Sequence, residues 1–385
     1  MTGPAEELRK LEAQGLLRGL LPLESPSGPR VVRGGRELWN FASNDYLGLS
    51  RHPEIEAAMI EGVRRFGAGA AASRLVCGSL APHGLLENSL AEAKQAEAAL
   101  LFSSGFSTAL GVVPAVVGKG DFVVLDKLCH ACLIDAARLS GATVRVFPHN
   151  DLVKLGRLLC SIRARDAKAR ILVATESVFS MDGDLCPLAG LVELTENHDA
   201  LLLLDEAHGF GVLGDHGMGL AERENLQPRI AFQMGTLSKA AGISGGYLAA
   251  SRGWIDLMIN RARSFIYSTA PPPALAHAAA ASLALIRSDA GRALRKKLAE
   301  NISLLGNTPT AILPKVLGSN EAALAASAAL ADQGFMVPAI RFPTVPRGTA
   351  RLRVSLSAAH PPEVVEALAG AISRMADHPH AAAGP

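Results

Sequence analysis

The stretch ALLLLDEAHGFGVLG, residues 200–214, places an aspartate and a histidine directly after a continuous apolar run. A short unbroken run of this kind predicts a strand that is covered on both faces, as in a parallel sheet. Asp205 and His208 would then lie at the carboxyl end of the strand, where open α/β sheets bind their ligands. The sequence Asp-Glu-Ala-His fits two chemistries there: the magnesium-binding box of a nucleic-acid helicase, and the acid and histidine that hold an organic cofactor ring.

The composition and a missing motif argue against a helicase. Of 385 residues, 38 are Lys or Arg and 36 are Asp or Glu, so the formal net charge is +2, and aromatic residues make up only 4%. Proteins that bind polynucleotides use basic side chains for the phosphates or aromatic ones for stacking. A helicase also needs the phosphate loop GxxxxGK[ST]; the nearest candidate, VVGKGDF at 116–122, has Gly120 in place of the hydroxyl residue. We expect no nucleic-acid partner.

Membrane and metal binding are not expected either. No apolar run reaches the about 18 residues of a membrane span, and the N-terminus lacks a signal-peptide pattern. Five scattered cysteines predict reduced thiols and a cytoplasmic location. Cys129 and Cys132 have the spacing of half a zinc site, but no second pair follows, so we expect no metal.

Apolar runs alternate with amphipathic segments between residues 70 and 250, which predicts an α/β fold with a mainly parallel sheet between helices. The expected strands are 98–102, 121–126, 143–147, 171–176, 200–205 and 246–250. After one long Ala-rich helix over 275–300, a helix ending at Gly334 and a strand of alternating polarity, RLRVSLS (351–357), are expected. The expected domains are an N-terminal helix and hairpin segment (1–50), a large cofactor-binding α/β domain (51–273), a small α+β C-terminal domain with the linking helix (274–375) and a disordered tail (376–385).

A lysine follows the next apolar run along the chain. Lys239 ends the stretch GTLSK, one crossover along the expected sheet from Asp205. A desolvated lysine can bond covalently to an aldehyde, and a buried carboxylate can pair with a protonated ring nitrogen. Asp205, His208 and Lys239 together predict a site for pyridoxal 5'-phosphate (PLP).

Other residues suit the phosphate and the ring of PLP. Ser104, Gly105 and Phe106 follow a strand and open a helix, so their free amide groups suit a phosphate dianion. Thr236 offers a hydroxyl to the same phosphate, and His83 could lie flat on the pyridine ring.

A serine hydrolase is the alternative from a different class. Gly242, Ser244 and Gly246 satisfy the pattern GxSxG, whose serine must follow a strand and precede a helix. Here the order is reversed, because the expected strand 246–250 comes after the serine. Asp332 and His360 follow in the order of a catalytic triad, so this alternative stays open.

Long motifs give the chain a family resemblance. Over about residues 16–373 it resembles the α-oxoamine synthases, in His83, His130 and the motifs SNDYLGLS (43–50), SRLVCG (73–78), SSGF (103–106), ESVFSMDGD (176–184), LDEAHGFGVLG (204–214), GTLSKAAGISGGY (235–247) and FIYSTAPPPA (265–274). These are fold-type I PLP-dependent transferases, which condense an amino acid with an acyl-CoA and release CO2. Two departures stand out: the stretch near 301–312 is short, and Cys132 stands where a serine is common.

The resemblance implies a role for each matching residue. Lys239 would hold the cofactor and then take the Cα proton of the substrate, while Asp205 keeps the ring nitrogen protonated. His208 would bind the phenolic oxygen of the ring, His83 would stack on its face, and His130 would contact the substrate. Arg353 would anchor the substrate carboxylate; otherwise it is an arginine of an alternating strand that faces solvent. Less specific matches place Arg18, Asn44, Ser180 and Thr344 in the substrate pocket or beside the cofactor, and place Ser268 and Thr269 at the cofactor phosphate of the neighbouring subunit of a homodimer.

The C-terminal stretch AIRFPTVPRGTARLRVSLSAAH (339–360) narrows the expected substrates. With YSTAPPPA it is similar to the members of the family that join L-alanine to a pimeloyl thioester in biotin synthesis. Other members use glycine or serine with a different acyl-CoA, and a PLP-binding protein without catalysis is a further alternative. The sequence leaves open whether the acyl group arrives on CoA or on a carrier protein.

Overall fold

The computed structural model describes residues 3–306 and 308–377. By their contacts these residues form two compact units. The smaller unit contains the described residues of 1–48, 181–183 and of 297 onward; the larger contains 49–180 and 184–296. The domain boundaries expected from the sequence stay a prediction, and positions 378–385 of the expected tail lie outside the described residues.

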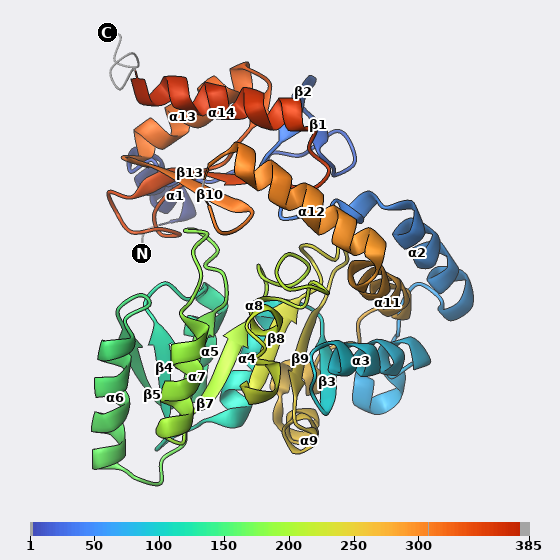
Figure 1. Ribbon diagram of the computed structural model, residues 1–385, viewed down its shortest axis with the longest axis vertical. Helices are drawn as coiled ribbons and strands as arrows, with labels where there is room; N and C mark the ends of the chain where they lie inside the picture. Colours follow the sequence, from blue (N-terminus) through green and yellow to red (C-terminus); the bar gives the residue numbers. More distant parts are fainter. Residues whose placement is uncertain (1–2, 307, 378–385) are drawn as a thin grey trace. The chain divides into compact units, whose positions relative to one another are not determined.

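A seven-stranded sheet forms the centre of the larger unit (Figure 1). Its strand order is β3-β9-β8-β7-β6-β4-β5, and every strand expected from an apolar run is present. The strands β8, β7, β6, β4 and β5 are parallel, whereas β9 pairs antiparallel with both β8 and β3. The bounds are β3 Ala98–Phe102, β4 Phe122–Asp126, β5 Thr143–Phe147, β6 Ile171–Glu176, β7 Leu201–Asp205, β8 Phe232–Thr236 and β9 Gly246–Ala250. The expected mainly parallel sheet is therefore confirmed.

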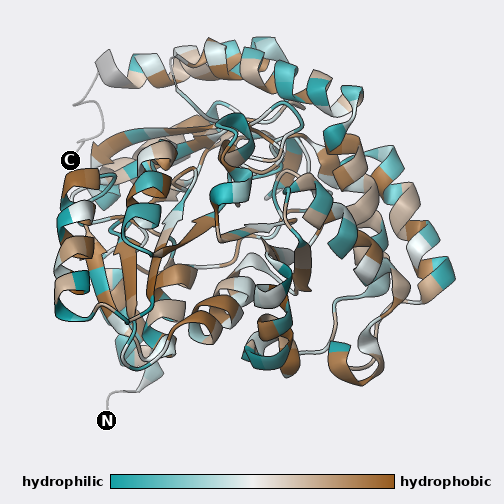
Figure 2. Ribbon diagram, turned by 60° about the horizontal axis from the view of Figure 1, so that its bottom comes forward, coloured by the Kyte–Doolittle hydropathy of each residue, from teal (hydrophilic) through white to brown (hydrophobic). Residues whose placement is uncertain are grey.

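Helices cover the sheet (Figure 2), which explains why β3, β4, β6 and β9 are buried along their whole length. Apolar side chains of α4 (Gly105–Val116), α5 (Ala131–Ser140) and α9 (Arg252–Arg261) share one buried cluster with alternate residues of the strands. Helices α3 (Ala81–Ala93), α6 (Leu152–Arg165) and α7 (Leu188–Asn197) pack on β3, β5 and β7. Before residue 273, this unit also contains α2 (Pro53–Phe66), α8 (Leu220–Arg223), α10 (Arg263–Ile266) and the short helical turns Leu49–Arg51, Arg74–Gly78 and Gln227–Arg229.

The single long helix expected over 275–300 is wrong. Two helices are present, α11 (Pro273–Arg287) and α12 (Asp289–Leu304). Ser288 between them has an extended backbone, and its carbonyl and hydroxyl oxygens accept hydrogen bonds from the amides of Arg292 (3.0 Å) and Gly291 (3.3 Å). Ser288 is thus the N-cap of α12. The short stretch after α12 still leaves room for β10 (Ile312–Gly318).

The smaller unit contains helix α1 (Pro4–Ala13) and a hairpin of β1 (Arg30–Arg33) and β2 (Arg36–Asn40), which pairs with β11 (Phe335–Met336). A second sheet has the order β10-β13-β12, with β12 at Ala339–Ile340 and β13 at Ala350–Ser355. Helices α13 (Asn320–Asp332) and α14 (Pro362–Asp377) complete it.

Strand β13 contradicts the alternative in which Arg353 faces solvent. All six residues of the strand are buried. Arg351 and Arg353 lie on one face of the strand, where Arg351 donates to Asp182 Oδ1 (2.6 Å) and Arg353 to Asn44 Oδ1 (3.1 Å). Within this unit, both arginines therefore have polar partners rather than water, and the role of Arg353 as a carboxylate anchor stays a prediction.

Candidate active site

Asp205 ends β7 at the carboxyl edge of the large sheet, as its sequence predicts. Its side chain is buried, and Oδ1 accepts a hydrogen bond from the amide of Ala207 (2.9 Å). Burial raises the pKa of the Asp205 carboxyl, while the positive charge of Lys239 opposes that shift. A buried carboxylate of this kind favours a cationic partner such as a protonated ring nitrogen.

Lys239 lies in the tight loop between β8 and β9. The amide of Gly242 donates to the carbonyl of Lys239 (2.9 Å), and the amide of Leu237 donates to that of Gly245 (2.9 Å). Gly242 has φ +68°, and a β-carbon there would collide with the backbone of Ser50, so the loop requires glycine. This loop brings Lys239 Nζ to 2.8 Å from His208 Nε2. The predicted pair is therefore in contact.

The same loop contradicts the serine-hydrolase alternative. Ser244 follows a loop and is succeeded directly by β9, so it has neither a preceding strand nor a following helix. The nucleophile elbow needs both.

The start of α4 lies beside Thr236, where the sequence predicts an anion site. Ser104 caps this helix by accepting the amide of Ser107 (3.1 Å), and the first amides of a helix have no partner within it. Gly105 brings the helix close to β8, because a β-carbon on it would lie 3.3 Å from Thr236 Cβ. Thr236 is buried, and its hydroxyl donates to the carbonyl of Gly245 (2.8 Å). Helix amides and a hydroxyl thus converge at one place, which suits a phosphate dianion. Phe106 is 42% exposed.

His130 and Ser180 meet at Glu176, a residue to which the sequence motifs assigned no role. His130 caps α5 through Nδ1, which accepts the amide of Cys132 (3.2 Å). The backbone amides of His130 and Ser180 donate to the two carboxylate oxygens of Glu176, at 2.6 and 3.3 Å. Burial lowers the pKa of His130, and the charges of Asp205 and Lys239 act on the same ring. The position of Glu176 at the end of an expected strand was a signal that could have identified it.

His83 has a different environment. It is buried, its Nδ1 accepts the amide of Leu80 (3.1 Å) and its Nε2 lies 2.8 Å from the carbonyl oxygen of Pro271. Burial lowers its pKa, and the charges that act on it belong to Arg74 and Glu87 rather than to Asp205 or Lys239. These contacts account for His83 without a ligand, so its ring-stacking role stays a prediction.

Two predicted pairs of substrate residues are each in contact within the smaller unit. Arg353 is buried and donates to Asn44 Oδ1 (3.1 Å) and Ser355 Oγ (2.7 Å). Arg18 donates to Thr344 Oγ1 (3.1 Å) on the surface of the unit. The fold thus brings together residues that are far apart in the sequence, and their role in substrate binding stays a prediction.

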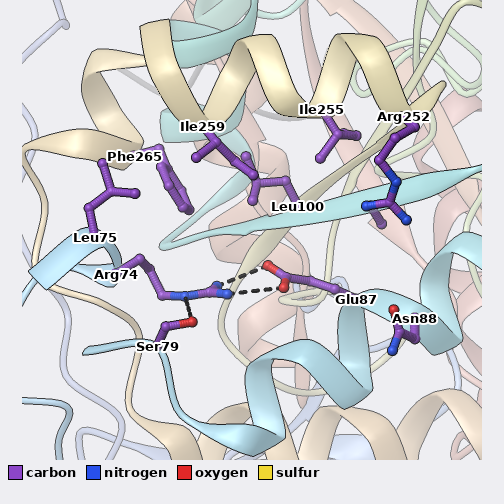
Figure 3. A pocket seen from close by; sticks show the side chains of 11 residues that line it. Arg74, Leu75, Ser79, Glu87, Asn88, Leu100, Arg252, Ile255, Ile259 and Phe265 are labelled. Atoms are coloured by element: carbon purple, nitrogen blue, oxygen red, sulfur yellow. Dashed lines mark hydrogen bonds and ion pairs between the residues drawn. The ribbon is translucent and has the colours of Figure 1, made fainter. Parts of the chain in front are cut away.

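A cavity of about 200 Å³ lies elsewhere in the larger unit (Figure 3). Arg74 binds Glu87 with two hydrogen bonds of 2.9 and 3.0 Å at its polar side, and Leu100, Ile259 and Phe265 line its apolar side. None of the predicted site residues lines it. Arg74 and Phe265 also line a small neighbouring hollow with Ser268 and Thr269.

Neither a metal centre nor a membrane span is found in the part of the chain that the structure describes. No group of three or more His, Cys, Asp or Glu residues there could bind an ion. No helix among residues 3–306 and 308–377 is long and apolar enough to cross a bilayer.

Comparison with known proteins identifies the family. The model of the family "Aminotransferase class I and II" matches residues 36–372, most of the chain. The chain belongs to this family. Among aminotransferase class I and II relatives, the 8-amino-7-oxononanoate synthases of Geobacter sulfurreducens and Nitrosospira multiformis are 45% and 49% identical. The matches cover 96% of this chain and 97% and 95% of those relatives.

Solved structures agree with this family. Serine palmitoyltransferase from S. paucimobilis, solved with PLP and myriocin bound, superposes with a TM-score of 0.91 at 28% identity, covering 97% of this chain and 96% of that one. The 8-amino-7-oxononanoate synthase of Francisella tularensis superposes with a TM-score of 0.76 at 26% identity, over 89% and 98% of the two chains. The expected fold of a PLP-dependent transferase and the expected cofactor are thereby confirmed.

Proposed function

We propose that this protein is an 8-amino-7-oxononanoate synthase, which condenses L-alanine with a pimeloyl thioester and releases CO2 and the free thiol. The observation that carries this assignment is the identity of 45–49% to synthases of that name over nearly the whole length of both chains. Serine palmitoyltransferase has a higher TM-score (0.91) than the solved synthase (0.76), but it is only 28% identical to this chain. The C-terminal stretch 339–360 supports the same substrates.

PLP fits the residues at the carboxyl edge of the sheet. The buried Asp205 offers a carboxylate for the ring nitrogen, Lys239 offers an amine beside His208, and the start of α4 with Thr236 offers donors for the phosphate. When bound, PLP draws electron density from the Cα of the substrate. Lys239 Nζ would hold the cofactor and would then take the Cα proton, because a desolvated amine can act as a base. His208 Nε2, 2.8 Å from that amine, would donate to the phenolic oxygen.

Polar side chains are assigned to the two substrates. Arg353 binds a substrate carboxylate through its planar guanidinium, and Asn44, already in contact with it, orients the side chain. Arg18 and Thr344 form a second polar pair for the acyl substrate. His130 and Ser180 contact the amino-acid portion or the cofactor.

Ser268 and Thr269 belong to the dimer part of the proposal. They follow α10, where Thr269 is exposed and forms an isolated bridge with Ser73. We assign them to the cofactor phosphate of the partner subunit, which makes the site shared between the two copies. The cytoplasmic location stays a prediction, supported by five free cysteines.

The assignment is tested with purified protein and PLP. Alanine, glycine and serine are each mixed with pimeloyl-CoA, a pimeloyl carrier protein or palmitoyl-CoA, and CO2, thiol and product mass are measured. Alanine with a pimeloyl thioester should be the productive pair. Turnover of glycine or serine with another thioester would keep the enzyme class and refute the substrates.

The control is Lys239→Ala. It should abolish turnover and the visible absorbance of bound PLP, and borohydride should no longer leave a cofactor mass on the peptide that contains residue 239. A wild-type protein that binds PLP but turns over none of the pairs would be a binding protein without catalysis.

A further inference from the structure

Glu176 is a buried carboxyl at the carboxyl edge of the large sheet, and the chemistry described above gives it no role. It ends β6, directly opposite Asp205 in the register of β6 and β7, and only 2% of its surface is exposed. Two carboxyl groups therefore lie side by side at the ends of adjacent parallel strands. Burying a second acid is costly unless its oxygens receive hydrogen bonds.

Both oxygens of Glu176 receive such bonds, and they come from two separate segments. Oε1 accepts the amide of His130, at the start of α5, and Oε2 accepts the amide of Ser180, in the segment that follows β6. An ionised carboxyl can accept at both oxygens, whereas a neutral one carries a proton on one of them. The Glu176 side chain thus joins two segments that each carry a predicted site residue.

The surrounding charges couple this contact to pH. Burial and the negative charge of Asp205 raise the pKa of Glu176 to about 8, while Lys239 and the two amides lower it. Cys129 and Cys132 are also electrostatic neighbours of Glu176, and burial raises the pKa values of both thiols, so they stay neutral. Asp205 and Lys239 are therefore the charged groups that control this carboxyl.

We propose that Glu176 is a positioning residue that holds His130 and Ser180 in place at the PLP site through their backbone amides. The proposal deepens the proposed function and rests on it, because only there do His130 and Ser180 have substrates or cofactor to contact. Because a protonated carboxyl oxygen is a weaker acceptor than an ionised one, protonation of Glu176 should weaken the hydrogen bond from one of the two amides.

The test is Glu176→Gln in the PLP-loaded enzyme. Glutamine keeps one acceptor oxygen but presents an NH2 group to the other amide. Hydrogen–deuterium exchange of the peptides containing His130 and Ser180 should become about tenfold faster in at least one of them, the size expected for one lost hydrogen bond. kcat with alanine should fall by about tenfold or more. In a plot of kcat against pH, the fall on the acid side (the pH limb) that reflects protonation of Glu176 should disappear.

Glu206→Gln is the matched control. Glu206 is also buried, follows a strand and accepts two backbone amides, those of Leu220 and Ala221, but it contacts neither His130 nor Ser180. It should lower the melting temperature without faster exchange at His130 and Ser180. Glu176→Asp, which keeps the charge on a shorter side chain, should keep the pH limb with partial protection and provides a second variant if Glu176→Gln does not fold.

The outcomes separate the two proposals. Faster exchange confined to the His130 and Ser180 segments, with loss of the pH limb, supports the positioning role. Unchanged exchange in those segments, or faster exchange throughout the chain with an unchanged pH profile, overturns it. A wild-type enzyme that fails to turn over alanine and pimeloyl thioester refutes the proposed function, while the exchange rates of the same preparation still report whether Glu176 holds the two amides.

Discussion

Asp205 shows at the scale of one residue how stability and activity oppose each other. Burial raises the pKa of its carboxyl, so the ionised form destabilises the cofactor-free fold at neutral pH. We expect Asp205→Asn to raise the melting temperature of the cofactor-free protein and to lower kcat by about 10²–10³, because the amide cannot keep the ring nitrogen protonated. Calorimetry and steady-state kinetics measure both changes. An unchanged kcat would exclude Asp205 as the partner of the ring.

The surroundings of His149 predict that the protein becomes less stable at alkaline pH. One ring nitrogen lies 3.0 Å from Asp126 Oδ1 and the other 2.7 Å from Asp184 Oδ2. Burial disfavours the charged ring, but the two carboxylates outweigh the effect of burial and raise the pKa of His149 to about 10. A raised histidine pKa stabilises the fold fully below about pH 6.5 and loses this contribution as the pH rises towards 10. Urea unfolding should show His149→Gln to be about 2 kcal/mol less stable at pH 6.5. The difference should shrink at pH 10; a constant difference would contradict the charged pair.

At the scale of the elements, the junction of β9 and α4 sets the position of Ser104 in the proposed phosphate site. A β-carbon on Gly246 would collide with the carbonyl oxygen of Ser104 and lie 2.5 Å from Thr108 Oγ1. Gly246→Ala should therefore cost about 1–3 kcal/mol and weaken PLP binding by displacing Ser104. Thermal unfolding and PLP titration measure these effects.

Gly253→Ala is the control for this junction. Gly253 lies in α9, and a β-carbon added to it would meet no atom within 4 Å. Its replacement should leave PLP binding intact and stabilise the helix by up to about 1 kcal/mol. Equal weakening of PLP binding by both variants would refute the junction as its cause.

At the scale of the whole molecule, the proposed sharing of sites between subunits can be tested by mixing two defective proteins. Lys239→Ala lacks the amine, and the double variant Ser268→Ala with Thr269→Ala lacks the donors assigned to the partner's phosphate. If those donors act across the interface, each mixed dimer has one intact site. Random exchange should then restore about a quarter of wild-type activity. If they act within their own subunit, mixing restores none.

The strands and the position of Lys239 were predictable because their signals are local. Continuous apolar runs predict strands covered on both faces; Asp205 ends such a run, and Lys239 lies in the loop that follows the next strand. Ser288 was missed because a serine among helix-forming residues is common, and only its bonds to Gly291 and Arg292 make it a cap. The reversed direction of β9 was missed because apolar runs carry no information on strand direction.

The order of residues alone was enough for the α/β class and the cofactor, and it is also what proposes Asp205, His208 and Lys239 as site residues, because each of these predictions depends on a short pattern along the chain. The contacts of Glu176 and Arg353 required the folded chain. Glu176 accepts an amide 46 residues away, and Arg353 contacts a residue 309 positions away. Hydrogen bonds between residues so far apart in the sequence leave no local pattern. The two partners come within bonding distance only after the strands and helices between them have packed.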